Sequence, residues 1–270
     1  MPDVRKAIIP CGGKGTRMAS LTGGRAKELM PVAGRPQLLW VLAECAASGA
    51  DEVLVVASPN KEDLIEVALA AAGKPEMPRR IETVIQREPR GLADAIRHGI
   101  DFTADEAFGV ALPDNVFVAD TPALRQVIDA HHQTSRNVVG VVELFPDDAE
   151  RAGPTAIYPG RLEDDIYIID NIPPKGARGA TFDLQGAPSG FTGIGRYVFL
   201  PEFFATTDEI EKDLTGGAEV DDVPVMRLLL ARDRLVGRRI VGDFFDVGLP
   251  VGYREANQRL AATQQPRVAR

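Results

Sequence analysis

Cysteine, histidine and long apolar stretches are all scarce in this 270-residue sequence. Its two cysteines, Cys11 and Cys45, cannot form the disulfide framework that stabilises small secreted domains. No apolar run approaches the roughly 18 residues that a membrane-spanning helix needs. No basic segment followed by an apolar core marks a secretory signal at the start. We therefore expect a cytoplasmic protein that has no membrane partner.

Positive charge is also in short supply. The sequence has 31 Lys and Arg against 39 Asp and Glu, which gives a formal net charge of −8. Surfaces that bind nucleic acid are usually basic, so this balance argues against a nucleic-acid partner. A single nucleotide remains a compatible substrate, because a divalent metal ion and a few local cations can offset its charge.

Glycine is concentrated near the start of the chain. An apolar run, Ala7–Pro10, predicts a short buried strand, and it is followed at once by Gly12, Gly13 and Gly15. Glycine allows a sharp turn and a close approach of backbone N–H groups, and converging N–H groups form an anion site. Arg17 and Lys27 add two positive charges nearby. The segment therefore predicts a polyphosphate site.

Two common phosphate motifs do not match this glycine turn. A P-loop requires G-x-x-x-x-G-K-[ST], but Lys14 is followed by Gly15 and position 8 is not glycine. A dinucleotide-binding fingerprint requires G-x-G-x-x-G, and Gly13 and Gly15 fit it, but position 18 is Met18. As a phosphate site, the turn would belong to another class. The alternative is a glycine-rich turn from strand to helix, with Arg17 and Lys27 on the surface.

Apolar strand-like runs alternate with helix-like segments through the first half. The predicted strands are 7–10, 52–57, 82–86 and 107–112, and the predicted helices are 37–48, 61–72 and 92–99. This alternation is typical of a parallel sheet with helices on both faces. Ligands of such sheets bind at the carboxyl ends of the strands, where the glycine turn, Gln86 and Asp114 all lie. We expect these three features to meet in one cleft.

The second half is less regular. It predicts strands at 137–144, 156–158, 165–169, 195–200 and 235–241, helices at 223–231 and 253–262, and loops over 173–190. Together the two halves predict an α/β fold with a Rossmann-like, mixed but mainly parallel sheet flanked by helices. A small β-rich part belongs to the second half. Residues 1–262 form one domain in this interpretation, and 263–270 form a frayed tail.

Gln86 is a candidate for base recognition. A glutamine amide offers one acceptor and two donors, so it can pair with the O4 and N3–H edge of uracil or thymine. Gly91 follows in the pattern Q-x-x-x-x-G-L-x-x-A. The alternative is a polar strand end followed by a glycine at a helix start. The glycine turn, which the predicted fold places nearby, favours the first interpretation, in which Gln86 and Gly91 form a pocket for the base.

Asp114 and Asp246 are candidates for a metal site. Each follows an apolar run, in L-P-D-N and F-D-V-G respectively. Two carboxylates from different strands suit Mg²⁺, which keeps several waters and also binds substrate phosphate. The alternative is that each aspartate stabilises a turn. Their occurrence together, with a phosphate site, favours the metal.

These motifs jointly resemble a known enzyme family. The pattern G-G-x-G-T-R-M, with K-E-L-M-P starting nine residues after the methionine, is similar to the signature of the sugar-1-phosphate nucleotidylyltransferases. The resemblance is strongest to bacterial glucose-1-phosphate uridylyltransferases and thymidylyltransferases and covers about residues 5–262. The segment Gly195–Val198, G-R-Y-V, also resembles the uridylyltransferases. The resemblance implies transfer of a nucleotidyl group from a nucleoside triphosphate to a sugar 1-phosphate, with Mg²⁺ as cofactor.

The resemblance also implies roles for particular residues. The catalytic set is Arg17, Lys27 and Asp114, and the metal ligands are Asp114 and Asp246. The nucleotide-binding set is Gly12, Gly13, Gly15, Thr16, Gln86 and Gly91, within a nucleotide-binding half of about 1–135. The sugar-phosphate set is Gly153, Asp170, Lys175 and Gly195, within a sugar-binding half of about 136–262.

The chain departs from the family around the sugar site. The family's V-E-K-P, whose Glu and Lys hold the sugar and its phosphate, is replaced by Ile169-Asp170-Asn171-Ile172-Pro173-Pro174-Lys175. Asp170 stands in place of the Glu, and Lys175 comes several positions later than the family's Lys. These departures leave the identity of the sugar phosphate open. The sequence also leaves open whether the protein forms a homo-oligomer.

Three other functions compete with this interpretation. The chain could transfer a different nucleotide or use an unusual phosphorylated substrate, although K-E-L-M-P and G-R-Y favour UTP over dTTP. A non-catalytic sensor of sugar nucleotides would not require Arg17, Lys27, Asp114 and Asp246 all to be present. A glycosyltransferase of related fold would need a D-x-D metal motif, which the sequence lacks.

Overall fold

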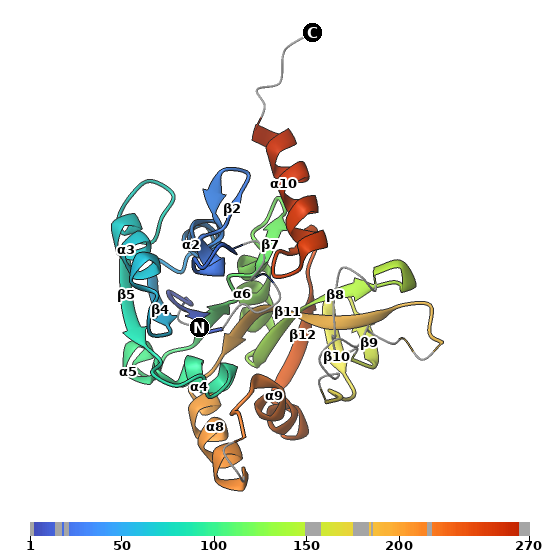
Figure 1. The fold of residues 1–270 in the computed structure, drawn as a ribbon. Helices are drawn as coiled ribbons and strands as arrows, with labels where there is room; N and C mark the ends of the chain where they lie inside the picture. The colour runs from blue at the N-terminus through green and yellow to red at the C-terminus, as the bar shows by residue number, and fades with distance from the viewer. Residues whose placement is uncertain are drawn as a thin grey trace.

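A central mixed sheet organises the computed structural model, which describes residues 3–13, 18, 22–148, 158–174, 184, 186–214 and 218–264 (Figure 1). Its strand order is β5-β4-β1-β6-β11-β8-β12-β10-β9. The strands are β1 (Lys6–Cys11), β4 (Glu52–Ala57), β5 (Arg80–Ile85), β6 (Phe108–Ala111), β8 (Asn137–Leu144), β9 (Gly160–Glu163), β10 (Ile166–Ile169), β11 (Gly190–Phe199) and β12 (Leu235–Arg239). All of them except β10 and β11 run in one direction. This mixed, mainly parallel sheet confirms the predicted fold class.

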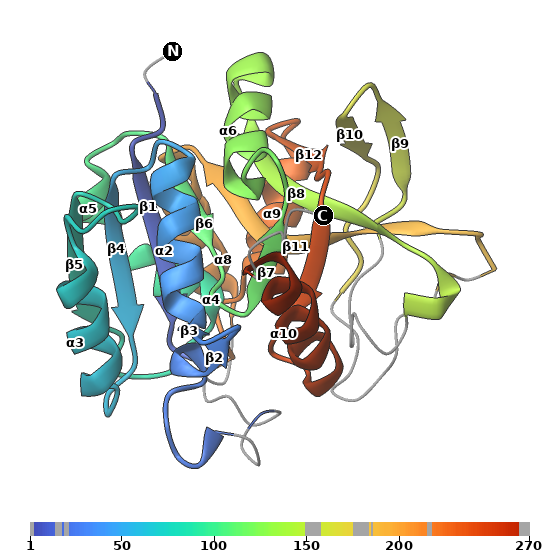
Figure 2. The same cartoon turned by 90° about the horizontal axis from the view of Figure 1, so that it is seen from above.

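Helices cover both faces of the sheet (Figure 2). One apolar cluster joins the sheet to α2 (Gln37–Ala47), α3 (Glu62–Ala71) and α6 (Ala123–Thr134). A second joins its other face to α4 (Leu92–Arg97), α8 (Glu202–Asp213) and α9 (Asp222–Ala231). Strands buried on both sides must be apolar throughout, which is why Glu52–Ala57 is a continuous apolar run after its first position.

Short elements surround the carboxyl ends of β1 and β6. They are the 3₁₀ helix η2 (Lys27–Leu29) and the strands β2 (Pro31–Val32), β3 (Arg35–Pro36), β7 (Asn115–Val118) and β13 (Asp243–Asp246). Helix α10 (Pro250–Gln264) packs against β2, β7 and β13 in a third apolar cluster. This cluster packs the last described helix against the short strands β2, β7 and β13. The remaining elements are α5 (Ile100–Thr103) and η3 (Pro146–Asp148).

The sequence analysis did not predict two of the longer helices, the first half of one strand, or the short elements α5, β2, β3, β7, β9 and β13. Helices α6 and α8 were not predicted, and β11 begins at Gly190 rather than at Gly195. The first half of β11, G-F-T-G, has weak intrinsic strand propensity because glycine has no side chain to pack. Pairing with β8 holds it extended, from Gly190 opposite Leu144 onward. Of the predicted strand 156–158, only Tyr158 lies within the described residues, as an isolated bridge to Phe191.

The described part of the chain contains no helix that is both long and apolar enough to cross a membrane. Helix α10 continues to Gln264, which is two residues into the predicted tail, and 265–270 lie outside the described residues.

Candidate active site

Lys27 and Asp114 form an ion pair where β1 and β6 end. Lys27 begins η2, and Asp114 lies in the turn between β6 and β7. The Lys27 Nζ atom lies 2.7 Å from Asp114 Oδ2, and the two side chains are 15% and 19% exposed. A Cβ atom on Gly13 would stand 3.9 Å from Lys27 Nζ, so the glycine turn borders the same pair. The tertiary structure thus brings together three positions that lie up to about a hundred residues apart in the sequence.

Asp246 reaches the same place through strand pairing. Strand β13 pairs with β7, which sets Asp246 opposite Asn115, and the Val247 N–H donates to the Asp114 carbonyl at 2.8 Å. A Cβ atom on Gly248 would stand 3.2 Å from Asp114 Oδ2 and 3.0 Å from Asp246 Oδ1. The two carboxylate oxygens therefore lie no farther apart than those two distances combined, and a side chain on Gly248 would crowd both of them.

The chemistry of this carboxylate pair suits a divalent metal ion. Two aspartates supply hard oxygen ligands from two sides, which is the chemistry that Mg²⁺ prefers. Among the residues that the structure describes, no group of three or more His, Cys, Asp or Glu side chains could hold a metal ion. A metal at Asp114 and Asp246 would complete its coordination with water and substrate oxygens, as expected for Mg²⁺ in phosphate chemistry.

Arg196 supports the Asp114 turn, and the sequence analysis gave it no role. Its side chain is fully buried, and its guanidinium pairs with both oxygens of Glu44 on α2, at 2.8 and 2.7 Å. It also donates to the carbonyls of Leu112 at 3.0 Å and Asn115 at 2.7 Å, which flank Asp114. The G-R-Y-V motif contained this signal. Its arginine stabilises the turn that carries Asp114.

Lys61 supports the glycine turn in the same way. Its ammonium donates to the carbonyls of Cys11 at 2.6 Å and Gly13 at 3.2 Å. It also contacts both oxygens of the buried Glu28 at 3.0 Å. Glu28 belongs to the K-E-L-M-P motif, but no local signal marks Lys61. This cation ties the glycine turn to η2 and so fixes the position of Lys27 relative to the turn.

Gln86 lies beside the glycine turn at the end of β5. Its Nε2 donates to Asp94 Oδ2 at 2.7 Å and to the Gly91 carbonyl at 3.3 Å. A Cβ atom on Gly12 would stand 2.4 Å from Gln86 Oε1, so only glycine leaves room for the amide there. The predicted neighbours Gly12 and Gln86 are thus in contact, and an aspartate that the sequence analysis overlooked holds the amide.

The backbone conformation and close packing at Gly91 require glycine at this position. Its φ is +110°, and a Cβ atom there would stand 2.4 Å from the Val220 carbonyl oxygen. The segment before α9 therefore fills the side where a Cβ would stand. Contact between Gly91 and a base remains a prediction.

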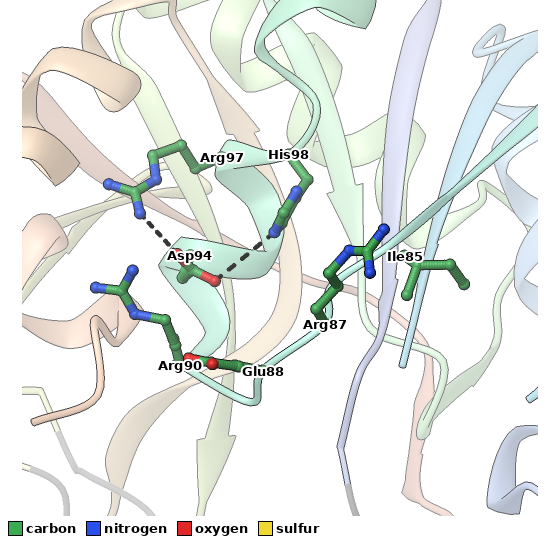
Figure 3. A pocket seen from close by; sticks show the side chains of 7 residues that line it. All are labelled: Ile85, Arg87, Glu88, Arg90, Asp94, Arg97 and His98. Carbon is green, nitrogen blue, oxygen red and sulfur yellow. Dashed lines mark hydrogen bonds and ion pairs between the residues drawn. The ribbon is translucent and has the colours of Figure 1, made fainter. Parts of the chain in front are cut away.

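A cavity of about 460 Å³ lies between the segment that follows β5 and helix α4 (Figure 3). Its lining residues are Ile85, Arg87, Glu88, Arg90, Asp94, Arg97 and His98. Arg97 donates to Asp94 at 2.7 Å and also pairs with Asp208 and Glu211 of α8, and Arg90 pairs with Glu211. Acidic side chains therefore compensate most of the positive charge on the wall of the cavity.

The predicted sugar-phosphate residues are described only in part. Gly153 and Lys175 lie outside the described residues, as do Gly15, Thr16 and Arg17 of the predicted phosphate site. Asp170 is exposed at the end of β10, where its N–H donates to the Pro159 carbonyl at 2.9 Å. Gly195, at φ +67°, packs directly on Leu112 and Asn115, where a Cβ atom would stand 2.4 Å from Asn115 Nδ2. The sugar-phosphate set stays a prediction.

Neither cysteine is expected to react with a thiol reagent in the folded protein at about pH 8. Burial, and then the Glu28 carboxylate, raise the pKa of the Cys11 thiol well above its usual value. Burial, and then Glu44, raise the pKa of Cys45 to about 12. Because only the thiolate is nucleophilic, both shifts suppress reaction until the pH rises far above the ordinary thiol range. A colorimetric thiol titration with and without denaturing urea checks this, and rapid labelling without urea would contradict it.

The sequence matches the nucleotidyl transferase family over residues 6–263. It is 30% identical to the UTP–glucose-1-phosphate uridylyltransferase of Bacillus subtilis (strain 168), over 94% of this chain and 89% of that protein. It is 32% identical to a putative UTP–glucose-1-phosphate uridylyltransferase of the same organism, over 93% and 94% of the two chains.

Solved structures share the fold. A UDP-glucose pyrophosphorylase complexed with UDP-glucose superposes with a TM-score of 0.81 at 22% identity, over 97% of this chain and 100% of that one. A putative glucose-1-phosphate thymidylyltransferase from Bacillus anthracis gives a TM-score of 0.76 at 20% identity, over 98% and 97%. With its glycine turn, its paired aspartates and a family match over almost its whole length, the chain belongs to the nucleotidyl transferase family.

Proposed function

We propose that the protein is a sugar-1-phosphate nucleotidylyltransferase, which converts UTP or dTTP and a sugar 1-phosphate into an NDP-sugar and pyrophosphate. The observation that carries this proposal is the meeting of Lys27, Asp114 and Asp246 beside the glycine turn. The names of the two Bacillus subtilis relatives favour UTP as the donor and glucose 1-phosphate as the first acceptor to test.

The reaction needs positioning and charge neutralisation more than covalent catalysis. An oxygen of the sugar phosphate attacks the α-phosphorus of the triphosphate. The bond from that phosphorus to the bridging oxygen breaks, and pyrophosphate leaves with the bonding electrons on the opposite side. Negative charge moves onto the leaving group, and cations fixed in advance stabilise it more effectively than solvent does.

The chain's own residues supply much of this machinery. In this proposal the N–H groups of the glycine turn, Gly12 and Gly13, hold the triphosphate. Lys27, which borders Gly13, neutralises the α-phosphate and the incoming phosphate together. Arg17 stabilises the departing pyrophosphate. Asp114 and Asp246 would hold Mg²⁺, which neutralises phosphate charge when bound.

The test is a screen for pyrophosphate release. Each nucleoside triphosphate is combined with a panel of sugar 1-phosphates in the presence of Mg²⁺. Release with UTP or dTTP, dependent on the sugar phosphate, supports the proposal. Tight binding of nucleotide or NDP-sugar without release would favour the non-catalytic sensor. Release only with purine triphosphates would overturn the assigned donor.

Removal of divalent metal is expected to abolish turnover. Lys27 is the one cation that the described residues place at this carboxylate pair, and one ammonium cannot neutralise a triphosphate. Pyrophosphate release should therefore vanish in excess chelator and return on adding Mg²⁺ beyond the chelator concentration. Undiminished turnover after exhaustive chelation would remove the metal from the proposal.

A further inference from the structure

The amide of Gln86 is held in one orientation. Its side chain is almost completely buried, at 3% exposure. The two groups that its Nε2 contacts, the Asp94 carboxylate and the Gly91 carbonyl, act as acceptors. Turning the amide over would set Oε1 against these two acceptors and leave both without their donor. A buried polar group without a partner is costly, so the observed orientation is strongly preferred.

This orientation decides which atom faces the glycine turn. Gln86 Oε1 is the atom that a Cβ on Gly12 would strike at 2.4 Å, so it lies against the turn that is assigned to the triphosphate. The free end of the amide on that side is therefore a hydrogen-bond acceptor. Both hydrogens of the amide are directed away from it, toward Asp94 and Gly91.

Asp94 is itself held firmly. It is 4% exposed, and its Oδ1 accepts a 2.7 Å hydrogen bond from Arg97 (Figure 3). Arg97 is anchored in turn on Asp208, at 3.2 Å, and on Glu211 of α8. Its hydrogen bond to Glu211, followed by those to Asp94 and Asp208, raises the pKa of Arg97, so the guanidinium stays charged. A chain of charged contacts thus runs from the surface of α8 to the amide of Gln86.

We propose that Asp94 is a specificity-determining positioning residue: by holding Gln86 as an acceptor, it selects bases that carry an N–H at the position Gln86 reads. The proposal rests on the nucleotide site proposed above. Uracil and thymine carry a hydrogen on N3, whereas cytosine has a bare acceptor nitrogen there. Because cytosine and uracil have the same size, this selection acts on hydrogen-bond polarity alone, without help from steric exclusion.

The wild-type protein should accordingly discriminate between UTP and CTP. Two acceptors that face each other lose a hydrogen bond and leave both groups unpaired. The expected preference for UTP in kcat/KM is roughly 10- to 100-fold, the range that one unsatisfied buried polar group produces. A wild-type protein that uses CTP as well as UTP, or better, would overturn the proposal.

The decisive variant is Asp94→Asn. The new side chain has the same shape, but its amide can either donate or accept, so Gln86 is free to turn over. We expect the UTP-to-CTP ratio of kcat/KM to fall about 10-fold, with CTP gaining in absolute rate. A merely structural role would reduce both rates together and leave the ratio unchanged. That outcome, in a folded variant, would contradict the proposal.

Glu88→Gln is the matched control. It removes one negative charge from an exposed residue on the wall of the same cavity, and it should leave the ratio at the wild-type value. If Asp94→Asn fails to fold, as judged by circular dichroism, Arg97→Gln loosens Asp94 without changing it. A smaller decrease in the ratio is then expected, and an unchanged ratio in this variant counts against the proposal.

Calorimetric titration with UTP and CTP separates this proposal from the enzymatic one. If no sugar phosphate supports turnover but UTP still binds more tightly than CTP, and Asp94→Asn removes that difference, the positioning role stands and the proposed reaction fails. If turnover with UTP is robust but Asp94→Asn leaves the preference intact, the reaction stands and the positioning role fails. If neither nucleotide binds, both fail.

Discussion

Asp114→Asn should reduce kcat by about 10²- to 10³-fold while the protein remains folded, the loss seen when one preorganised electrostatic group of a transition state is removed. Asp114 is the residue shared by the ion pair with Lys27 and the carboxylate pair with Asp246. Asparagine keeps the shape of the side chain, and the Val247 hydrogen bond to the backbone carbonyl of residue 114 does not depend on the charge. The substitution therefore removes the charge and leaves the turn.

Steady-state pyrophosphate release, measured over a range of Mg²⁺ concentrations, checks this result. Asp120→Asn is the control, because it makes the same change of charge at an exposed position six residues further along. We expect Asp120→Asn to match the wild type at every metal concentration. If Asp114→Asn also matched it, Asp114 would have no part in the metal site.

The loss should appear in kcat rather than in KM. Charge neutralisation at the α-phosphate matters most as the bond to pyrophosphate breaks, so its removal raises the transition state more than the bound ground state. A change confined to KM would assign Asp114 to ground-state binding of the nucleotide.

Arg196→Met is expected to lower the free energy of unfolding by about 3–5 kcal/mol, the usual cost of removing one partner from a buried ion pair. The guanidinium is fully buried and satisfies Glu44 together with the carbonyls of Leu112 and Asn115. Methionine fills similar space but donates nothing. It leaves a largely buried carboxylate and three carbonyls, those of Leu112, Asn115 and Gly195, without this partner.

Urea denaturation monitored by circular dichroism measures this effect. Arg232→Met is the matched control, because Arg232 pairs with Glu209 on the surface, where the side chains are 44% and 50% exposed. Such exposed pairs contribute about 0–1 kcal/mol. A loss at Arg196 no larger than that at Arg232 would mean that the buried network contributes little.

A double variant tests the origin of the cost. Adding Glu44→Gln to Arg196→Met removes the uncompensated charge, so it should restore part of the lost stability. Activity should not recover with it, because the carbonyls on either side of Asp114 still lack their donor. Full recovery of activity in the double variant would show that Arg196 has no influence on the shape of the turn that carries Asp114.

Much of the fold could be predicted because local patterns specify local elements. The valine-rich segment Glu52–Ala57 is a strand with the predicted bounds, and so is Asn137–Leu144. Turn residues after these runs mark the carboxyl edge of the sheet. Because the strands that end there are parallel, the glycine turn, Gln86 and Asp114 all lie at this edge. Helices α6 and α8 were missed. Helix α8, E-F-F-A-T-T-D-E-I-E-K-D, buries only one face and contains adjacent threonines that weaken a helical pattern.

The sequence by itself determined the family and the class of fold, and it predicted the residue types that the proposed chemistry needs. Their partners were decided by the tertiary structure alone. Arg196 pairs with Glu44, which lies 152 positions away in the sequence. Lys61 bonds to the Gly13 carbonyl, 48 positions away. The pairing of β13 with β7 brings Asp246 close to Asp114. Periodicity and turn residues act within one helix, strand or turn, so these local elements can be predicted from the sequence. The pairing of buried charges and the orientation of the Gln86 amide follow instead from desolvation. A buried polar group must find its partner among whichever segments packing has brought beside it.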